Sequence, residues 1–237
     1  MFRNIKLFLI LAIYLIRSQK LMKRISNMSD IEERAQAIAV EGEEWGQMLL
    51  RNVHGEITVV GAEKIDPNKT VCFISNHQSY FDIPIFLGYI PMKKAFLAKV
   101  EILKVPILSK WMHLMRCVFI DRKNIRQSVT AIKEATQILK DGLSMVVFPE
   151  GTRAKDGVIG EFKSGGFKMA VSSGVPIVPV TIDGAFRFFD KSEKIKGPVK
   201  VSLIVDDMVE TTGLSKEEVS ELPDKIRSII ARNLEGK

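Results

Sequence analysis

Two side chains capable of proton transfer, His77 and Asp82, stand five residues apart in the stretch NHQSYFD. The hydrophobic run 71–74 before it is typical of a buried strand, so His77 is expected at the carboxyl edge of a sheet, where open α/β sheets gather ligands. Positions five apart on a regular helix point about 140° away from each other. His77 must therefore lie in the turn, from which Asp82 can reach back to it. A carboxylate on one imidazole nitrogen fixes the tautomer and leaves the other nitrogen as a base toward a hydroxyl.

The same stretch also has a purely structural interpretation. Ser79 is a favoured helix N-cap, and Asp82 three residues later can complete a capping box, so that His77 would be incidental. Pro84 disfavours helical geometry at the residue before it and leaves the start of the helix open. The rest of the chain has to decide between the two interpretations.

A second candidate stretch is SMVVFPEGTR, residues 144–153. It predicts a strand followed by a turn. Gly151 lets the backbone approach a ligand closely, and the guanidinium of Arg153 is a planar fork suited to phosphate. A solvated pair between Glu150 and Arg153 is the simpler alternative.

Two more stretches lie at the ends of predicted strands. CVFIDR ends a strand at residue 120 and presents Asp121 and Arg122 in a loop, again at an edge. GVPIVPV, residues 174–180, frames a hydrophobic strand with two prolines, which indicates an architectural role.

The chain from about residue 56 alternates short β-rich runs with helical ones, which predicts a layered α/β sheet flanked by helices. A helix is predicted over 124–140. Another is predicted from Ser215, which forms a capping box with Glu218, and Pro223 interrupts it. We expect a catalytic domain over residues 56–237 and membrane-associated helices over residues 1–55. The predicted strands are 57–60, 71–74, 118–120, 145–148, 177–182 and 199–205.

The N-terminus carries an apolar run, residues 7–16, with basic residues on both sides. Ten helical residues rise about 15 Å, half of a hydrocarbon core roughly 30 Å thick, so a helix at the membrane interface suits the run better than a full span. Basic flanks favour an anionic leaflet. A signal peptide and a buried soluble helix are the alternatives, although RSQK follows the run in place of a small-residue cleavage site.

A second helix is predicted from Ser29, with Glu32 completing a capping box. Its apolar stripe is expected to pack on the body of the protein, with a grip on the membrane as the alternative. The stripe consists of Ile31, Ala35, Ile38, Trp45 and Leu49.

Composition limits the choice of partners. A hydrophobic content of 46% in 237 residues is ample for one packed core, and the formal net charge of +7 favours anionic partners. Basic residues are not interleaved with aromatic ones, so we expect no nucleic acid as partner. Cys72 and Cys117 sit in apolar runs without metal-ligand spacing, which indicates buried thiols, a reducing compartment and no structural metal.

The blocks NHxxxxD, FIDR, FPEGTR and VPIVPV, in this order and at these intervals, resemble the glycerolipid acyltransferase family, specifically the 1-acyl-sn-glycerol-3-phosphate acyltransferases. The resemblance covers residues 57–184 and also fits an N-terminal pair of membrane-associated helices. Cys117 stands where a glycine would be expected. Because cysteine is small, we expect a change in local packing and not in chemistry.

The resemblance implies that His77 removes the proton from the sn-2 hydroxyl of lysophosphatidic acid while Asp82 orients the imidazole. The oxygen attacks an acyl thioester of coenzyme A or acyl carrier protein to give phosphatidic acid, without cofactor or metal. Backbone N–H groups near the helix start after His77 are expected to stabilise the oxyanion. The substrate-binding positions that the resemblance assigns are Lys99, Arg122, Glu150, Gly151, Thr152 and Arg153.

Several alternatives stay open from the sequence. Lys99 can equally be a solvated surface lysine, and the residues Ile83, Ile85, Phe86 and Leu87 can line an acyl groove or pack in the core. The acceptor can be glycerol 3-phosphate or another lysophospholipid, and a non-catalytic lipid-binding protein would keep the same fold. We expect peripheral or monotopic attachment to the cytoplasmic face of a membrane.

Overall fold

The computed structural model describes residues 2–154, 156–189 and 194–235, and at residues 2–4, 6–8 and 15 it describes the backbone alone. Seven strands form one sheet in the order β1-β7-β6-β2-β5-β3-β4. Neighbouring strands are parallel except β6 and β7, which are antiparallel. The strands are β1 (Gly55–Val60), β2 (Cys72–Ser75), β3 (Lys94–Lys99), β4 (Val118–Ile120), β5 (Ser144–Val147), β6 (Ile177–Asp183) and β7 (Val199–Val205).

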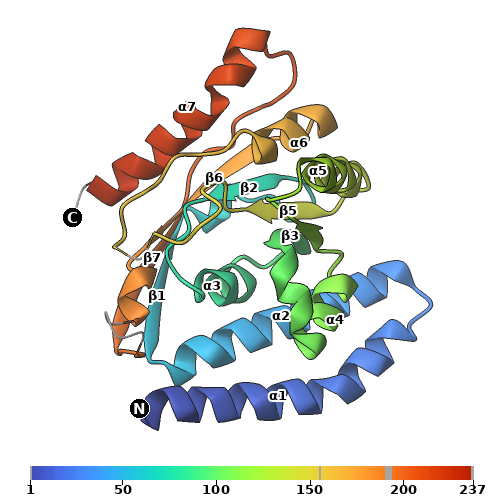
Figure 1. The fold of residues 1–237 in the computed structure, drawn as a ribbon, viewed down its shortest axis with the longest axis vertical. Coiled ribbons are helices and arrows are strands. Elements are labelled where there is room, and N and C mark those ends of the chain that lie inside the picture. The colour runs from blue at the N-terminus through green and yellow to red at the C-terminus, as the bar shows by residue number, and fades with distance from the viewer. Residues whose placement is uncertain (1, 155, 190–193, 236–237) are drawn as a thin grey trace.

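Helices cover both faces of this sheet, as the alternating pattern predicts (Figure 1). On one face lie α5 (Ile125–Lys140), α6 (Gly165–Ser173) and α7 (Lys216–Glu235), and on the other lies α3 (Asp82–Tyr89). Beyond α3 lie α1 (Phe2–Ser26), α2 (Ile31–Asn52) and α4 (Pro106–Leu114). The layered α/β fold that the sequence predicts is therefore confirmed.

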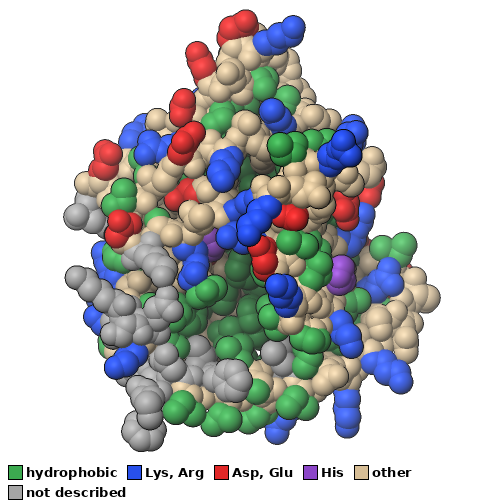
Figure 2. All heavy atoms as spheres, in the orientation of Figure 1, with side chains coloured by type: hydrophobic (Ala, Val, Ile, Leu, Met, Phe, Trp, Pro, Cys, Tyr) green, Lys and Arg blue, Asp and Glu red, His purple; other side chains and the backbone are tan. Residues whose placement is uncertain are grey.

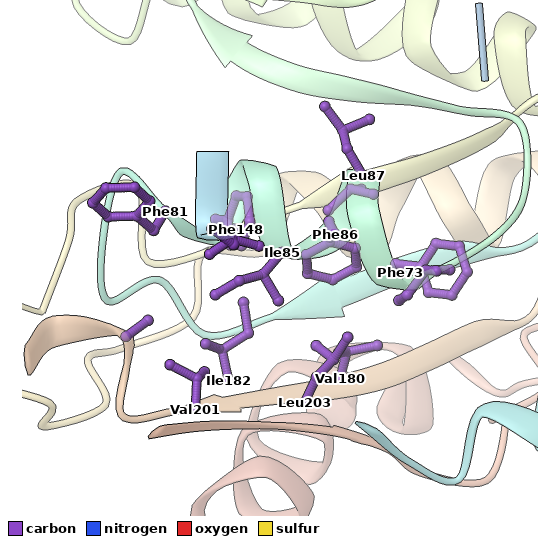
Figure 3. Packing of buried hydrophobic residues seen from close by; sticks show 14 of the residues in the cluster. Phe73, Phe81, Ile85, Phe86, Leu87, Phe148, Val180, Ile182, Val201 and Leu203 are labelled. Carbon is purple, nitrogen blue, oxygen red and sulfur yellow. The ribbon is translucent and has the colours of Figure 1, made fainter. Parts of the chain in front are cut away.

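Alternating side chains of the central strands divide the core between these two layers. Phe73 of β2 faces α3, and Cys72 and Ile74 on either side of it face α5, α6 and α7. Figure 3 shows Ile85 and Phe86 directed toward the strands that carry Phe73 and Ile182. The helix that follows the histidine is thus fixed on the sheet by its apolar face.

All six predicted strands are present, two of them with the predicted ends and four with ends shifted by one or two residues, but β3 was not predicted. Its sequence KAFLAK contains no β-branched residue and reads poorly as a strand. The strand forms because it lies between β5 and β4 and pairs with both. Pairing in the sheet outweighs weak local propensity here.

Two helix ends differ from the prediction. The N-cap of α2 is Asp30 and not Ser29, because the Asp30 carboxylate accepts hydrogen bonds from the N–H groups of Glu32 and Glu33 at 2.8 and 2.9 Å. Ile31 is consequently exposed and does not belong to the packed stripe. The capping box of Ser215 and Glu218 is present at the start of α7.

Pro223 lies inside α7 without ending the helix. The proline removes one backbone hydrogen bond. Burial of Leu222, Ile226 and Ile230 on one side of α7 holds the helix together across it.

The C-terminal half of α1 packs on the body. Trp111 of α4 donates its indole N–H to Ser18 Oγ at 2.9 Å, and Met22 and Ile25 are buried beside it. Further toward the N-terminus, α1 exposes an apolar stripe consisting of Ile5, Leu9, Ile13 and Ile16. Of the predicted apolar run, the side chains of residues 7, 8 and 15 lie outside the described residues.

Among the residues that the structure describes, no helix is both long enough and apolar enough to cross a membrane.

The helices α2 and α3 approach each other closely, which sets the position of α3 beneath the site. A Cβ added to Gly46 of α2 would lie 2.8 Å from the backbone nitrogen of Gly88 in α3. Glycine at this crossing therefore lets the two backbones touch. α2 packs on the body of the protein, as its stripe predicts.

A buried lysine links the end of α3 to β3. The ammonium of Lys94 donates to the carbonyl oxygens of Ile90 and Met92 at 2.6 and 3.0 Å, and the side chain is almost fully buried. Burial lowers the pKa of Lys94 to about 7, and the nearby Glu43 partly opposes this shift. The unfolded chain therefore binds a proton that the folded chain lacks between pH 7 and 10.5.

Replacement of Lys94 by Met is expected to change how stability depends on pH. Because the folded pKa lies below the unfolded one, the free energy of unfolding of the wild type should rise relative to that of Lys94→Met as the pH increases from about 7 to about 10. Urea unfolding of both proteins across this range measures the difference. Parallel curves would show that the amine keeps its ordinary pKa in the folded protein.

Candidate active site

Three of the four sequence blocks and Lys99 meet at one edge of the sheet because the strands before them are parallel. β2, β5, β3 and β4 lie side by side and run in the same direction, so their carboxyl ends share an edge. His77 follows β2, Lys99 ends β3, and Arg122 follows β4. The FPEGTR block follows β5, next to His77. Segments far apart in the sequence thus build one site.

The predicted contact between His77 and Asp82 is present. Nδ1 of His77 lies 2.6 Å from Oδ2 of Asp82, and the Asp82 side chain is completely buried. The same oxygen accepts from the backbone N–H groups of Gln78 and Ser79 at 2.7 and 2.9 Å. The carboxylate oxygen serves as an acceptor, so Nδ1 carries the proton and Nε2 is left with a free lone pair.

These contacts also correct two expectations about the turn. Ser79 does not cap the helix, which begins at Asp82 with Phe81 as its N-cap; the Ser79 hydroxyl accepts from the N–H of Phe81 at 3.3 Å. The N–H groups of Gln78 and Ser79 point to the Asp82 carboxylate, and that of Asp82 points to the carbonyl of Ser79. The turn uses these donors to fix the dyad, so they are not free for an oxyanion as expected.

The backbone of His77 is held from both sides by the block after β5. Its N–H donates to Oε1 of Glu150 at 2.7 Å, and its carbonyl accepts from the N–H of Ala154 at 2.7 Å. The imidazole stacks on Phe148 with ring centroids 4.4 Å apart. Because backbone and ring are both fixed, the direction of Nε2 is set before any ligand binds.

The residue before His77 ties the turn to β6. The Asn76 side chain donates to the carbonyl of Ile182 and accepts from its N–H, both at 2.8 Å. This amide pairs with β6 as a strand backbone would and extends the sheet by one position. Gln78 accepts from the N–H of Gly184 at 3.1 Å on the same side.

Gly151 is required for both its backbone and its missing side chain. Its φ of +76° lies in the left-handed region, and Arg122 donates to its carbonyl. A Cβ at this position would lie 2.8 Å from Cζ of Arg122. Burial lowers the pKa of Arg122 below its ordinary value, and Glu101 partly opposes the shift.

A second guanidinium is held by an aromatic ring. Cζ of Arg153 lies 3.5 Å from the ring centroid of Tyr80, an exposed residue of the NHQSYFD stretch. Tyr80 in turn contacts the edge of Phe189. Sequence reasoning missed Tyr80, although an aromatic residue three positions after the histidine was a visible signal.

A cavity of about 540 Å³ opens beside these groups, within the range typical of ligand sites. Its walls are largely apolar and come from α2, α3, β3 and α4, with Trp45, Leu87 and Met112 among them. Figure 2 shows a hollow lined by hydrophobic side chains, with basic and acidic side chains gathered along one edge. The cavity can therefore hold an apolar chain while its edge holds an anion.

Most of the predicted site residues line this cavity. They are His77, Lys99, Arg122, Gly151, Thr152 and Arg153. Asp82 lies buried behind His77, as its predicted role requires.

Glu150 does not line the cavity. Its two oxygens accept from the N–H groups of His77 and Gly160 at 2.7 and 2.9 Å, so the carboxylate is committed to the backbone. Burial raises the pKa of Glu150, and these donors partly offset the rise. The structure thus gives Glu150 a supporting place where substrate contact was predicted.

The apolar residues after Asp82 divide between two roles. Ile83 and Leu87 line the cavity, whereas Ile85 and Phe86 are fully buried in the core. A polar pair that sequence reasoning missed also lines the cavity. The pair consists of Tyr14 of α1 and Glu41 of α2, and the Tyr14 hydroxyl donates to the Glu41 carboxylate. Burial raises the pKa of Tyr14.

No group of three or more His, Cys, Asp or Glu side chains is placed to hold a metal ion in the part of the chain that the structure describes. Cys117 is buried and lines the cavity.

Comparison with known proteins identifies the family. The family described as Acyltransferase matches residues 56–183, and this match includes all four sequence blocks. The chain belongs to the acyltransferase family. This chain is 35% identical over 191 residues to a probable 1-acyl-sn-glycerol-3-phosphate acyltransferase of Mycoplasma genitalium. The alignment covers 76% of this chain and 71% of the relative. It is 32% identical over 180 residues to the 1-acyl-sn-glycerol-3-phosphate acyltransferase of Borreliella burgdorferi, and that alignment covers 76% of this chain and 72% of the relative.

A solved structure shares the whole fold of this acyltransferase. The 1-acyl-sn-glycerophosphate (LPA) acyltransferase PlsC from Thermotoga maritima superposes with a TM-score of 0.86 at 29% sequence identity. The similarity covers 99% of this chain and 95% of that one. It therefore includes the N-terminal helical pair as well as the sheet.

Replacement of Gly151 by Ala in the acyltransferase should lower acyl transfer as well as the free energy of unfolding. Gly213 provides a matched control, because its φ is also +76° but a Cβ there would meet nothing within 4 Å. Each variant should lose about 1–3 kcal/mol of unfolding free energy from the strained backbone. Only Gly151→Ala should also lose acyl transfer, by tenfold or more, because it displaces Arg122. Equal activity of the two variants would contradict the placement of Arg122.

Proposed function

We propose that this acyltransferase transfers an acyl chain from an acyl thioester to the sn-2 hydroxyl of 1-acyl-sn-glycerol 3-phosphate and so makes phosphatidic acid. The observation that carries the proposal is the position of the His77–Asp82 pair at the edge of an apolar cavity that also carries Arg122 and Arg153. The acceptor named for the relatives has an acyl chain, a hydroxyl and a phosphate, and this arrangement offers a place for each.

In the proposed mechanism, Nε2 of His77 removes the hydroxyl proton as the oxygen attacks the thioester carbonyl. Asp82 holds Nδ1–H and stabilises the imidazolium that forms. Collapse of the tetrahedral intermediate breaks the C–S bond, and the imidazolium returns the proton to the leaving thiolate. The hydroxyl oxygen is the nucleophile, so no acyl-enzyme forms and no protein thiol is needed.

Arg122 and Arg153 are proposed to bind the acceptor phosphate, and Lys99 and Thr152 extend the same edge. Both guanidinium groups are held in place, Arg122 by the Gly151 carbonyl and Arg153 by the Tyr80 ring. Arginine suits this task because its planar donors match phosphate geometry. The apolar walls are proposed to take an acyl chain.

The protein is further proposed to sit on the cytoplasmic face of a membrane, where acceptor and product reside. The exposed apolar stripe of α1 is followed along the helix by the basic residues Arg17, Lys20, Lys23 and Arg24. Apolar side chains beside basic ones are typical of a helix that lies in an anionic interface. Tyr14 of the same helix lines the cavity, so the docked helix would bring the lipid surface next to the site.

Replacement of His77 by Ala should lower acyl transfer to lysophosphatidic acid about 10²- to 10⁴-fold, since general-base help is lost. The assay uses purified protein in detergent micelles with coenzyme A and carrier-protein thioesters, and glycerol 3-phosphate as a competing acceptor. His113→Ala serves as the control, because His113 packs at a tilt against Phe119 and does not line the cavity. A wild-type protein that binds lysophosphatidic acid without turnover, or an active His77→Ala, would overturn the proposed function.

The membrane proposal predicts that charges on the α1 stripe abolish vesicle binding. Replacement of Leu9, Ile13 and Ile16 together by Glu should reduce pelleting with anionic vesicles at least tenfold, because burial of each apolar side chain is worth about 1.5–3 kcal/mol. The matched control replaces Ile125 and Val129, exposed on α5, by Glu. These substitutions leave the buried contacts of Ser18 and Met22 intact, which a deletion of the helix would not. Equal pelleting of both variants would contradict the proposal.

A further inference from the structure

A side chain from the C-terminal helix reaches the loop behind the catalytic histidine. Nε of Arg227 in α7 donates to the carbonyl of Gly160 at 2.8 Å, and Nη2 donates to the carbonyl of Ile159 at 3.2 Å. α7 lies outside residues 56–183, which the acyltransferase family match covers. The four sequence blocks therefore give no indication of this contact.

The loop passes the contact on to Glu150. The N–H of Gly160, the residue whose carbonyl Arg227 holds, donates to Oε2 of Glu150 at 2.9 Å. The other oxygen of Glu150 accepts from the N–H of His77 at 2.7 Å. A continuous series of hydrogen bonds thus runs from Arg227 through Gly160 and Glu150 to the backbone of His77.

The geometry makes this series sensitive to the loss of its first member. Glu150 is only 7% exposed, so water cannot readily replace a lost donor. The loop around Gly160 has no helix or strand of its own, and Arg227 fixes two of its consecutive carbonyls. α7 itself is a firm support, because Leu222, Ile226 and Ile230 anchor it on the sheet.

We propose that Arg227 is a positioning residue for acyl transfer, which acts through Gly160 and Glu150 on the direction of the His77 imidazole. Arg227 does not line the cavity. Its guanidinium holds the loop so that Glu150 can hold the histidine backbone. The inference rests on the proposed role of His77 as the base.

Kinetics of Arg227→Ala test the inference. A small misplacement of a catalytic group costs up to about 10²-fold in rate, so kcat should fall about 10- to 100-fold while KM for acceptor and donor changes less than about threefold. Arg227→Lys should recover part of the rate, because an ammonium can still donate to one of the two carbonyls. Arg232→Ala, an exposed arginine on the same helix, is the control and should keep wild-type kcat.

A double-mutant cycle separates positioning from loss of stability. If Arg227 acts through Glu150, then Arg227→Ala should change kcat much less in a Glu150→Gln protein than in the wild type. Additive effects of the two substitutions, or a wild-type kcat in Arg227→Ala, would overturn the inference. His77→Ala, measured alongside, distinguishes the two failures. If His77→Ala loses activity while Arg227→Ala keeps the wild-type kcat, only the inference about Arg227 fails. If His77→Ala stays active, the proposed function and the inference both fail.

Discussion

One carboxylate oxygen, Oδ2 of Asp82, collects hydrogen bonds from the imidazole of His77 and from two backbone N–H groups. The carboxylate is completely buried, and at Oδ2 these donors take the place of water. The same three bonds also shape the turn and set the tautomer of the histidine. Folding of this turn and orientation of the His77 imidazole are therefore one event.

The sheet supplies the rest of the site through its topology. Parallel strands bring the ends of β2, β5, β3 and β4 to one edge, and the block after β5 grips the backbone of His77 at both its N–H and its carbonyl. Arg122 and Arg153, which line the same cavity, are each fixed by a neighbour from a different segment. The site is thus preorganised, as catalysis by positioned charges requires.

Sequence reasoning predicted the parts of this site that depend on local order. The spacing of His77 and Asp82 dictates a turn, and that turn is present. Strand β3 was missed because KAFLAK has little β-propensity and forms only through its two neighbours. The contacts of Glu150 were missed for a similar reason, since its partners are backbone groups 73 and 10 residues away in sequence. Contacts of this kind depend on the tertiary arrangement, and one chain offers no pattern for them.

The cavity connects the chemistry to the lipid surface. α1 and α2 contribute to its wall, and they carry both the exposed apolar stripe and the Tyr14–Glu41 contact. The central claim is that Nε2 of His77 faces the acceptor hydroxyl while the guanidinium groups hold its phosphate. A crystal structure with bound lysophosphatidic acid tests it most directly. The account predicts the sn-2 oxygen about 2.6–3.2 Å from Nε2, with the phosphate on Arg122 and Arg153. A phosphate bound elsewhere, or a hydroxyl turned away from His77, would contradict it.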